Sequence, residues 1–137
     1  IEDLPTGKFV TLVYALFDPK RSQVTFASAG HLQPILLSGN EPRFIETEQG
    51  LPLGLGPGKY SEVSVSLPPG SRFVLYSDGI TEATSPDGEE YGQARLQAHL
   101  HAADGSPGSL LESVRGFANG AGLSDDASVV MIRANSN

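Results

Sequence analysis

The strongest constraint in this sequence is a strand-like run that stops abruptly at an acidic residue. Residues 73–76 are all apolar or aromatic, and Ser77-Asp78-Gly79 follows directly. Gly79 permits a sharp backbone turn, so the run would hold the Asp78 carboxylate at the rim of a sheet. A carboxylate presented in this way is a typical ligand for a hard divalent cation. The same pattern also fits an ordinary Asp-Gly turn, which needs no ligand.

A second acidic pair precedes another apolar run near the C-terminus. Asp125 and Asp126 come just before Ser128-Val129-Val130-Met131-Ile132. Two predicted strands therefore each carry acid at one end, which favours a shared metal site over two unrelated turns. This hypothesis requires the side chains of Asp78 and Asp125 to converge in space.

Composition limits the fold and the partners. The chain has 137 residues, no cysteine and a formal net charge of -7. A chain of this length can bury one core without disulfides, so we expect a single domain over residues 1–137. Without thiolates, a metal would be held by oxygen or histidine ligands. The acidic charge argues against nucleic acid or an anionic membrane as a partner, because both require a basic surface.

Membrane insertion and secretion are not expected. No apolar run approaches the roughly 20 residues that a spanning helix needs, and no signal peptide opens the chain. We therefore expect a cytoplasmic protein without a membrane partner.

Periodicity predicts a series of strands, then two helices, then one more strand. Strands are predicted at residues 9–17, 24–28, 34–37, 62–67, 73–76 and 127–133, with a weaker candidate at 43–45. One helix begins near Gln93, and a second begins with Ser106 as N-cap before Pro107 and stops at Gly120. Each helix has one apolar face and should lie against a sheet. The order indicates an α+β domain with mostly antiparallel sheet.

Two finer expectations follow from the strand patterns. The run 9–17 is apolar at consecutive positions, which predicts a strand covered on both faces. Pro68-Pro69-Gly70 separates strands 62–67 and 73–76 and predicts that these two strands form a hairpin.

Other sites receive less support from the sequence. The Gly- and Pro-rich loop 50–58 lacks the lysine of a phosphate-binding P-loop and the strand-to-helix setting of a dinucleotide site. Asp87, Glu89 and Glu90 lack the spacing of an EF-hand loop and fit a solvated turn. No serine occupies a nucleophile elbow with a supporting His and Asp, so a nucleophilic hydrolase is unsupported.

The chain has three histidines. His31 follows Ala29-Gly30 at a predicted strand end, where it could act on a metal or a proton. A hydrogen-bonded structural role is favoured there by the turn context. His99 and His101 lie in the predicted helical region and receive no role.

Six blocks, taken in order, resemble the SpoIIE/RsbU branch of the PP2C-like (PPM) serine/threonine phosphatases. They are residues 9–12, 29–31, 50–54, 76–83, 87–92 and 124–126, and they span nearly the whole chain. The resemblance implies a PP2C-like α/β/β/α sandwich, in which two antiparallel sheets pack face to face with helices outside. It also implies two Mn²⁺ or Mg²⁺ ions that activate a water for attack on a phosphoserine.

The resemblance assigns site residues and a partner. Asp78 matches the ligand aspartate of the family's Asp-Gly motif, and Asp125 matches the first aspartate of its Asp-Asp or Asp-Asn motif. Asp126 takes the next position, which is not expected to ligate directly. Family substrates are typically phosphorylated anti-sigma-factor antagonists of the STAS type, so a small phosphoprotein partner is implied. The alternative is a non-catalytic interaction module on the same scaffold.

The sequence also departs from the family pattern. The motif Gly-Asp-x-x-Gly-x-Gly, whose aspartate bridges both metals, has no counterpart here, and the opening strands and helices of the domain are expected to be missing. Two carboxylates about 4 Å apart repel by about 4 kcal/mol at an effective dielectric of 20, a cost that metals relieve. We therefore expect the parent protein to be a phosphatase and these residues alone to be inactive or nearly so. The uncovered sheet would favour a homodimer or another partner.

Overall fold

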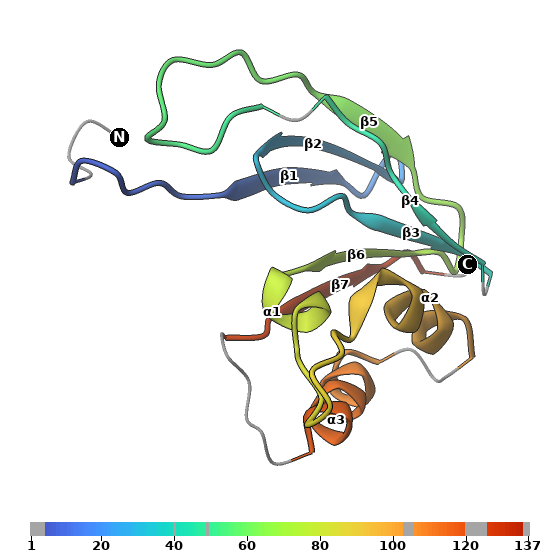
Figure 1. The fold of residues 1–137 in the computed structure, drawn as a ribbon. Coiled ribbons are helices and arrows are strands. Elements are labelled where there is room, and N and C mark those ends of the chain that lie inside the picture. The colour runs from blue at the N-terminus through green and yellow to red at the C-terminus, as the bar shows by residue number, and fades with distance from the viewer. Residues whose placement is uncertain (1–4, 40, 49, 103–105, 120–125, 136–137) are drawn as a thin grey trace.

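The computed structural model describes residues 5–39, 41–48, 50–102, 106–119 and 126–135. Their strands form two antiparallel sheets, and helices lie on one side of the pair (Figure 1). The elements are β1 (Leu12–Asp18), β2 (Gln23–Ala29), β3 (Ile35–Ser38), β4 (Glu41–Phe44), β5 (Val63–Ser66), β6 (Arg72–Tyr76), α1 (Asp78–Thr81), α2 (Gly92–Ala102), α3 (Pro107–Ala118) and β7 (Val129–Arg133). None of the helices within these ranges is both long and apolar enough to cross a bilayer.

The strands divide into a three-stranded sheet, β1-β2-β5, and a four-stranded sheet, β4-β3-β6-β7. Every pairing between these strands is antiparallel, and β1 and β2 form a hairpin. The predicted hairpin between the strands flanking Pro68-Pro69-Gly70 is wrong, because β5 and β6 belong to different sheets. The Leu67 amide still donates to Ser22, whereas the Gly70 amide donates to Ala134. The Pro-Pro-Gly segment therefore carries the chain from one sheet to the other.

One hydrophobic core lies between the two sheets. It contains Val24 and Phe26 of β2, Leu36 of β3, Phe73 of β6, and Ile45, Leu67 and Ala134. The rings of Phe26 and Phe73 meet across the sheets with their centroids 5.6 Å apart. Full burial of a phenylalanine side chain contributes roughly 1.5–3 kcal/mol, so this pair is a main source of sheet-to-sheet stability.

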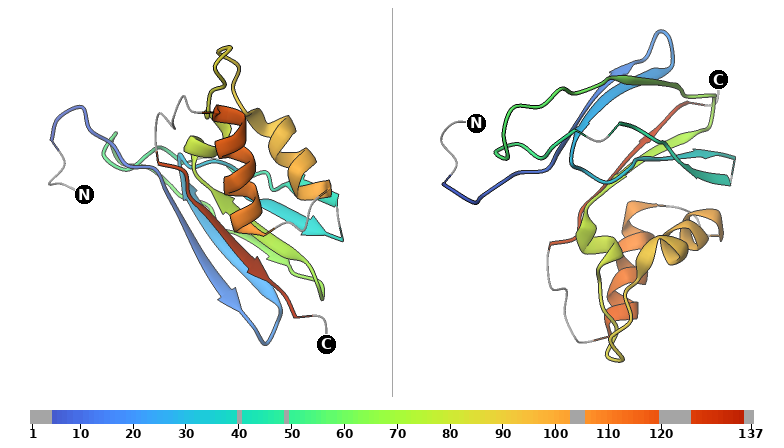
Figure 2. Two further views of the ribbon diagram at one scale, coloured as in Figure 1. Left: turned by 90° about the horizontal axis from the view of Figure 1, so that it is seen from below. Right: turned by 45° about the horizontal axis from the view of Figure 1, so that its top comes forward.

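A second core lies between the four-stranded sheet and the helices (Figure 2). The sheet contributes Ile35, Leu37, Val74 and Tyr76, and the helices contribute Ile80, Leu96, Leu100, Leu110 and Val114. The start of α3 is as predicted, because the Ser106 hydroxyl accepts from the Ser109 amide at 3.1 Å and Pro107 follows. The helix ends at Ala118, and its C-cap, Asn119, takes a left-handed φ of 44°. Gly120, the predicted stop, lies outside the described residues.

The outer face of the three-stranded sheet is not covered by any described segment. Leu12, Tyr14 and Leu16 of β1 point outward and are 46%, 61% and 59% exposed. The expectation that residues 9–17 are covered on both faces is therefore wrong, since only Val13 and Ala15 pack into the core. In the described chain, helices cover the sandwich on the four-stranded side alone (Figure 1).

This bare face generates a prediction about association. Large apolar patches seldom stay exposed to water, so we expect residues 1–137 to self-associate at high concentration. Leu16→Lys places a charge in the patch and should shift the population to monomer in light scattering. Ala94→Lys, at an exposed position on α2, is the matched control. A wild-type chain that stays monomeric at all concentrations would contradict the prediction.

The Tyr76 hydroxyl is buried and has no hydrogen bond among the described residues. Burial raises the pKa of Tyr76 to about 12, and an interaction with the Gln93 side chain, outside hydrogen-bonding geometry, partly offsets this shift. An unsatisfied buried hydroxyl costs about 1–3 kcal/mol. Tyr76→Phe should therefore unfold in urea at an equal or higher midpoint than wild type near pH 7.

The raised pKa of Tyr76 also gives a pH dependence with a definite sign. The unfolded tyrosine loses its proton near pH 10, whereas the folded one holds it to about pH 12. Wild-type stability should therefore fall between these pH values, and Tyr76→Phe should lose less stability over the same window. Urea unfolding of both proteins at pH 8 and pH 11 measures the difference, and parallel losses would contradict it.

Candidate metal centre

Asp78 lies where β6 ends and the short helix α1 begins. Its side chain is exposed, and the preceding residue, Ser77, still has an extended backbone with φ −92° and ψ 161°. The Ile80 amide then donates to Ser77 O at 3.1 Å, and the Glu82 amide donates to Asp78 O at 2.8 Å. The chain therefore leaves the sheet in one helical turn. The carboxylate stands at the rim of the sheet, as the sequence predicts.

Ser77 joins this rim to the segment that leads into β7. Its amide donates to Ser128 O at 2.9 Å, and its hydroxyl accepts from the Ser128 amide at 2.9 Å. The same hydroxyl donates to Asp126 O at 3.3 Å. Sequence reasoning missed this role, because a serine at a strand end carries no distinctive signal. The three bonds hold the second acidic segment beside Asp78.

Gly79 permits a closer approach than any other residue would. A Cβ atom at this position would overlap the carbonyl oxygen of Asp126 and lie 3.2 Å from Ala127 Cα. Both are main-chain atoms, so neither could move aside as the end of a long side chain does. Glycine is thus required here for close backbone packing. The packing brings α1 directly against the residue that follows Asp125.

Asp125 itself lies outside the described residues, so its convergence with Asp78 stays a prediction. Asp126 is described and exposed. Within the described ranges, no group of three or more His, Asp or Glu side chains is placed to hold a metal. One rim carboxylate, with the backbone of a second acidic motif fixed against it, fits part of the oxygen shell of a hard cation.

His31 connects the two sheets at this same end. Its ring Nε2 lies 3.1 Å from the carbonyl oxygen of Tyr76, which can only accept, so Nε2 carries the proton. The His31 amide donates to Ser28 Oγ at 3.1 Å, which fixes the backbone after Gly30, where φ is 69°. The ring makes the structural hydrogen bond that the turn context favours. Its acceptor residue, Tyr76, lies two residues before Asp78.

Two of the blocks that carry the family resemblance pack on each other beside His31. Ala29 forms a bridge with Gly50. A Cβ atom on Gly30 would lie 2.8 Å from Pro52 Cδ, and the Tyr60 hydroxyl donates to Leu51 O at 3.0 Å. The 50–54 loop therefore packs against the end of β2 and supports it.

The other acidic and histidine candidates have separate partners. Glu89 forms an ion pair with Arg95 at 3.0 Å in the turn ahead of α2, as a solvated turn would allow. The His99 ring lies 3.1 Å from Ser109 Oγ, between α2 and α3. His101 lies 3.7 Å from Glu41 at the surface. None of these contacts involves Asp78.

A sequence match to one protein family covers nearly the whole chain. Residues 1–135 match the model of the family described as Stage II sporulation protein E (SpoIIE). The chain therefore belongs to the SpoIIE family of PP2C-like domains. It is 33% identical over 89 residues to the phosphoserine phosphatase RsbU of Bacillus subtilis (strain 168), a match that covers 64% of this chain and 27% of RsbU.

Solved structures share the fold. The phosphatase domain of SpoIIE from Bacillus subtilis, presoaked with Mn, has a TM-score of 0.72 and 20% identity, covering 93% of this chain and 57% of that one. The RsbU and RsbW domains of Rv1364c from Mycobacterium tuberculosis have a TM-score of 0.76 and 23% identity, covering 99% and 39%. RsbX in complex with magnesium has a TM-score of 0.62 and 21% identity, covering 90% and 55%.

Coverage of these relatives is partial. The chain spans 27% and 21% of the lengths of two curated relatives, and 57% or less of the three solved chains above. The two facing antiparallel sheets are the PP2C-like architecture that the sequence predicts.

The packing at Gly79 yields a test of the site's construction. Gly79→Ala should lower the free energy of unfolding by about 1–3 kcal/mol, because the added methyl overpacks two main-chain segments. Gly116→Ala is the matched control, since a Cβ there meets nothing within 4 Å and alanine favours the interior of α3 by about 1 kcal/mol. Urea unfolding should show opposite signs for the two variants. Equal or higher stability of Gly79→Ala would contradict the close contact.

Proposed function

We propose that this chain is part of a metal-dependent phosphatase domain that hydrolyses phosphoserine on a regulatory protein. The observation that carries the proposal is the rim carboxylate of Asp78, held against the Asp126 backbone at Gly79. Membership of the SpoIIE family supports it, as does the similarity to RsbU, which is named a phosphoserine phosphatase. The proposed ligands from this chain are Asp78 and Asp125.

Mn²⁺ or Mg²⁺ is the proposed cofactor, as a pair of ions in a complete domain. Divalent ions supply a Lewis acid and an activated water for attack on phosphorus. Ionised Asp78 and Asp125 would bind them through carboxylate oxygens, which hard cations prefer. Ser77 and His31 would keep the Asp78 segment in place through their bonds to Ser128 and Tyr76. The chain's charge of -7 makes a cation necessary if an anionic phosphate is to approach.

These 137 residues alone are proposed to have little or no activity. A two-metal site needs ions about 3.5–4 Å apart, and the bridging aspartate that would anchor them has no counterpart in the sequence. Among the described residues, Asp78 does not belong to any group of three acidic or histidine side chains that could hold a metal ion. The full activity is therefore assigned to a complete domain that contains this chain.

The proposed substrate is a phosphorylated STAS-type antagonist of an anti-sigma factor, encountered in the cytoplasm. This choice follows the resemblance to the SpoIIE/RsbU branch and is supported by the match to RsbU. The second candidate is a non-catalytic interaction module. The sequence favours it in one respect, because the motif that supplies the bridging aspartate does not occur in these residues.

Asp78→Asn in a complete domain separates the two candidates. The substitution removes a ligand charge, so Mn²⁺-dependent phosphate release from a phosphoserine protein should fall by at least about 100-fold, beyond the 10–100-fold usual for a lost outer-shell partner. Asp87→Asn, at an exposed turn, is the control and should keep wild-type turnover. Unchanged turnover in Asp78→Asn would refute the site. A wild-type domain without Mn²⁺-dependent turnover would favour the interaction module.

A further inference from the structure

Two strand edges on one side of the sandwich have unused hydrogen-bonding groups. β4 pairs only with β3, and β5 pairs only with β2. The Ile45 amide donates to Pro34 O at 2.8 Å, and the Leu67 amide donates to Ser22 O at 2.7 Å. Antiparallel ladders alternate bonded and non-bonded positions. The next positions along each strand therefore turn their N–H and C=O groups away from the partner strand.

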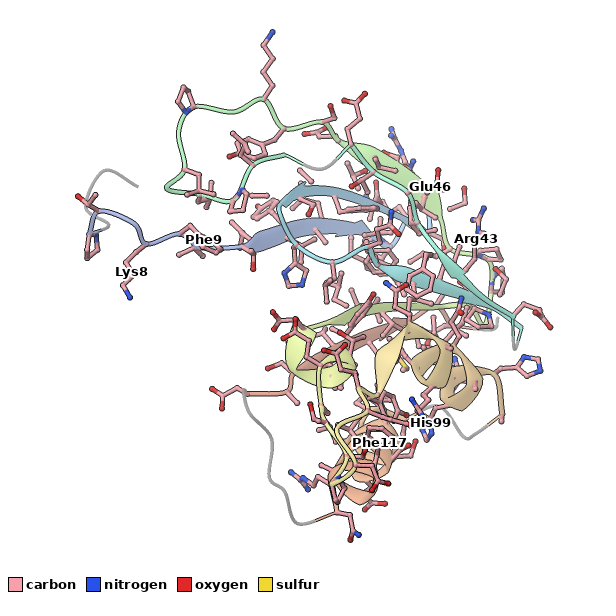
Figure 3. The ribbon with its side chains drawn as sticks, viewed as in Figure 1. Lys8, Phe9, Arg43, Glu46, His99 and Phe117 are labelled. Atoms are coloured by element: carbon pink, nitrogen blue, oxygen red, sulfur yellow. The ribbon has the colours of Figure 1, made fainter. Side chains whose placement is uncertain are left out.

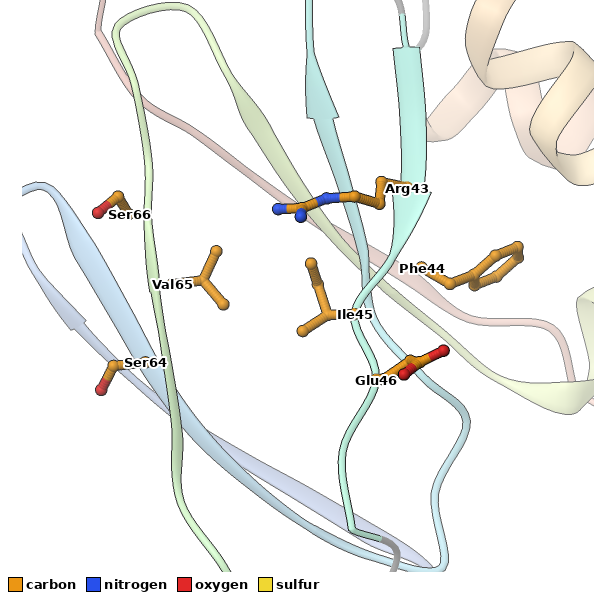
Figure 4. A pocket seen from close by; sticks show the side chains of 7 residues that line it. All are labelled: Arg43, Phe44, Ile45, Glu46, Ser64, Val65 and Ser66. Atoms are coloured by element: carbon orange, nitrogen blue, oxygen red, sulfur yellow. The ribbon is translucent and has the colours of Figure 1, made fainter.

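The outward-facing positions are Phe44 and Glu46 on one edge and Ser64 and Ser66 on the other. No backbone hydrogen bond of the described chain joins these two edges. Between them lies a groove of about 630 Å³, lined by residues 43–46 and 64–66 (Figure 4). Ile45, 7% exposed, and half-buried Val65 form its apolar floor. The groove thus offers ladder donors and acceptors along an apolar surface, which is what an extended peptide needs.

Arg43 gives the groove a charge preference. Its side chain extends from β4 toward Ser66 on the opposite wall, and Glu46 lies at the other end (Figure 4). Figure 3 places both residues on the β4 side of the sandwich, apart from His99 and Phe117 on the helices. No ion pair of the described residues involves Arg43. Arg43 therefore favours a partner carboxylate at its own end of the groove, whereas Glu46 disfavours one at the other end.

The strand register places one end of the groove at the level of the candidate metal centre. Ile35 pairs with Phe44 on one side and with Val74 on the other. β4 and β6 therefore run in the same direction, and Glu46 is level with Tyr76, two residues before Asp78. Only β3 separates the two strands, so they lie about 10 Å apart.

We propose that this groove is a docking site for an extended, acidic segment of the protein substrate. The segment adds to the free strand edges, packs apolar side chains on Ile45 and Val65, and places a carboxylate against Arg43. Pro42 has no amide hydrogen, so pairing along β4 is limited to the part nearest the metal centre. The identity of the partner as substrate rests on the proposed function, whereas strand binding does not.

A peptide titration tests the docking site without any turnover. The probe is the capped peptide acetyl-Thr-Val-Thr-Asp-Thr-Val-amide, in which the valine and aspartate side chains share one face of an extended strand, as Arg43 of β4 and Ile45 just after it do. It is added to the ¹⁵N-labelled chain to about 5 mM, where millimolar affinities are still detected. The amides of Phe44, Glu46, Ser64 and Ser66 should shift most. A peptide N-methylated at alternate residues cannot form the ladder and should leave them unshifted.

Arg43→Ala should raise the Kd for the peptide about tenfold, because a charge-assisted contact is lost. Arg21→Ala is the matched control, because Arg21 lies in the β1–β2 turn and faces Asp18 at 3.8 Å. Shifts confined to other amides, no shifts at all, or equal losses in both arginine variants would overturn the proposal. Perturbation of the same four amides by dilution alone would assign the groove to a second copy of the chain and overturn it too.

Kinetics in a complete domain separate the docking site from the chemistry. Arg43→Ala should raise KM for a phosphoprotein substrate severalfold with kcat nearly unchanged, whereas loss of Asp78 lowers kcat. Unchanged KM would overturn the role in substrate docking. Failure of the Asp78 prediction, by contrast, would refute the metal site and leave the peptide titration to decide the groove.

Discussion

The candidate site depends on the contact between the first turn of α1 and the main chain of Asp126. Only glycine at position 79 leaves room for that contact, and Ser77 reinforces it with bonds to Asp126 and Ser128. Asp78 and the main chain of Asp126, 48 positions apart in the sequence, are thereby held at one rim. Without this packing, each would be an isolated acidic turn at the surface.

β6 gives that rim its rigidity because it takes part in both hydrophobic cores. Phe73 packs between the sheets against Phe26, while Val74 and Tyr76 pack beneath the helices. A strand buried on both faces has little freedom to shift along its axis. The His31 ring, in the segment between β2 and β3, adds a hydrogen bond to the carbonyl oxygen of the last residue of this strand. The position of Asp78 is therefore set by packing on three sides.

The two sheets of the sandwich differ in how much of their outer faces is buried. Helices pack on the four-stranded sheet, whereas β1 exposes Leu12, Tyr14 and Leu16, and the edges of β4 and β5 flank an open groove. The chain matches only part of the length of its relatives in the SpoIIE family. Surfaces of this kind, apolar or rich in unused ladder groups, are where further protein binds.

Local pattern in the sequence determined much of this protein, including the strands of β2, β3, β5 and β6, the Ser106 cap, and an aspartate at the end of β6. Tertiary structure alone decided that Pro68-Pro69-Gly70 changes sheets, that one face of β1 is bare, and that Ser77 and His31 bond to residues 45 or more positions away. Alternation shows which side chains share a face, whereas the burial of that face depends on distant segments.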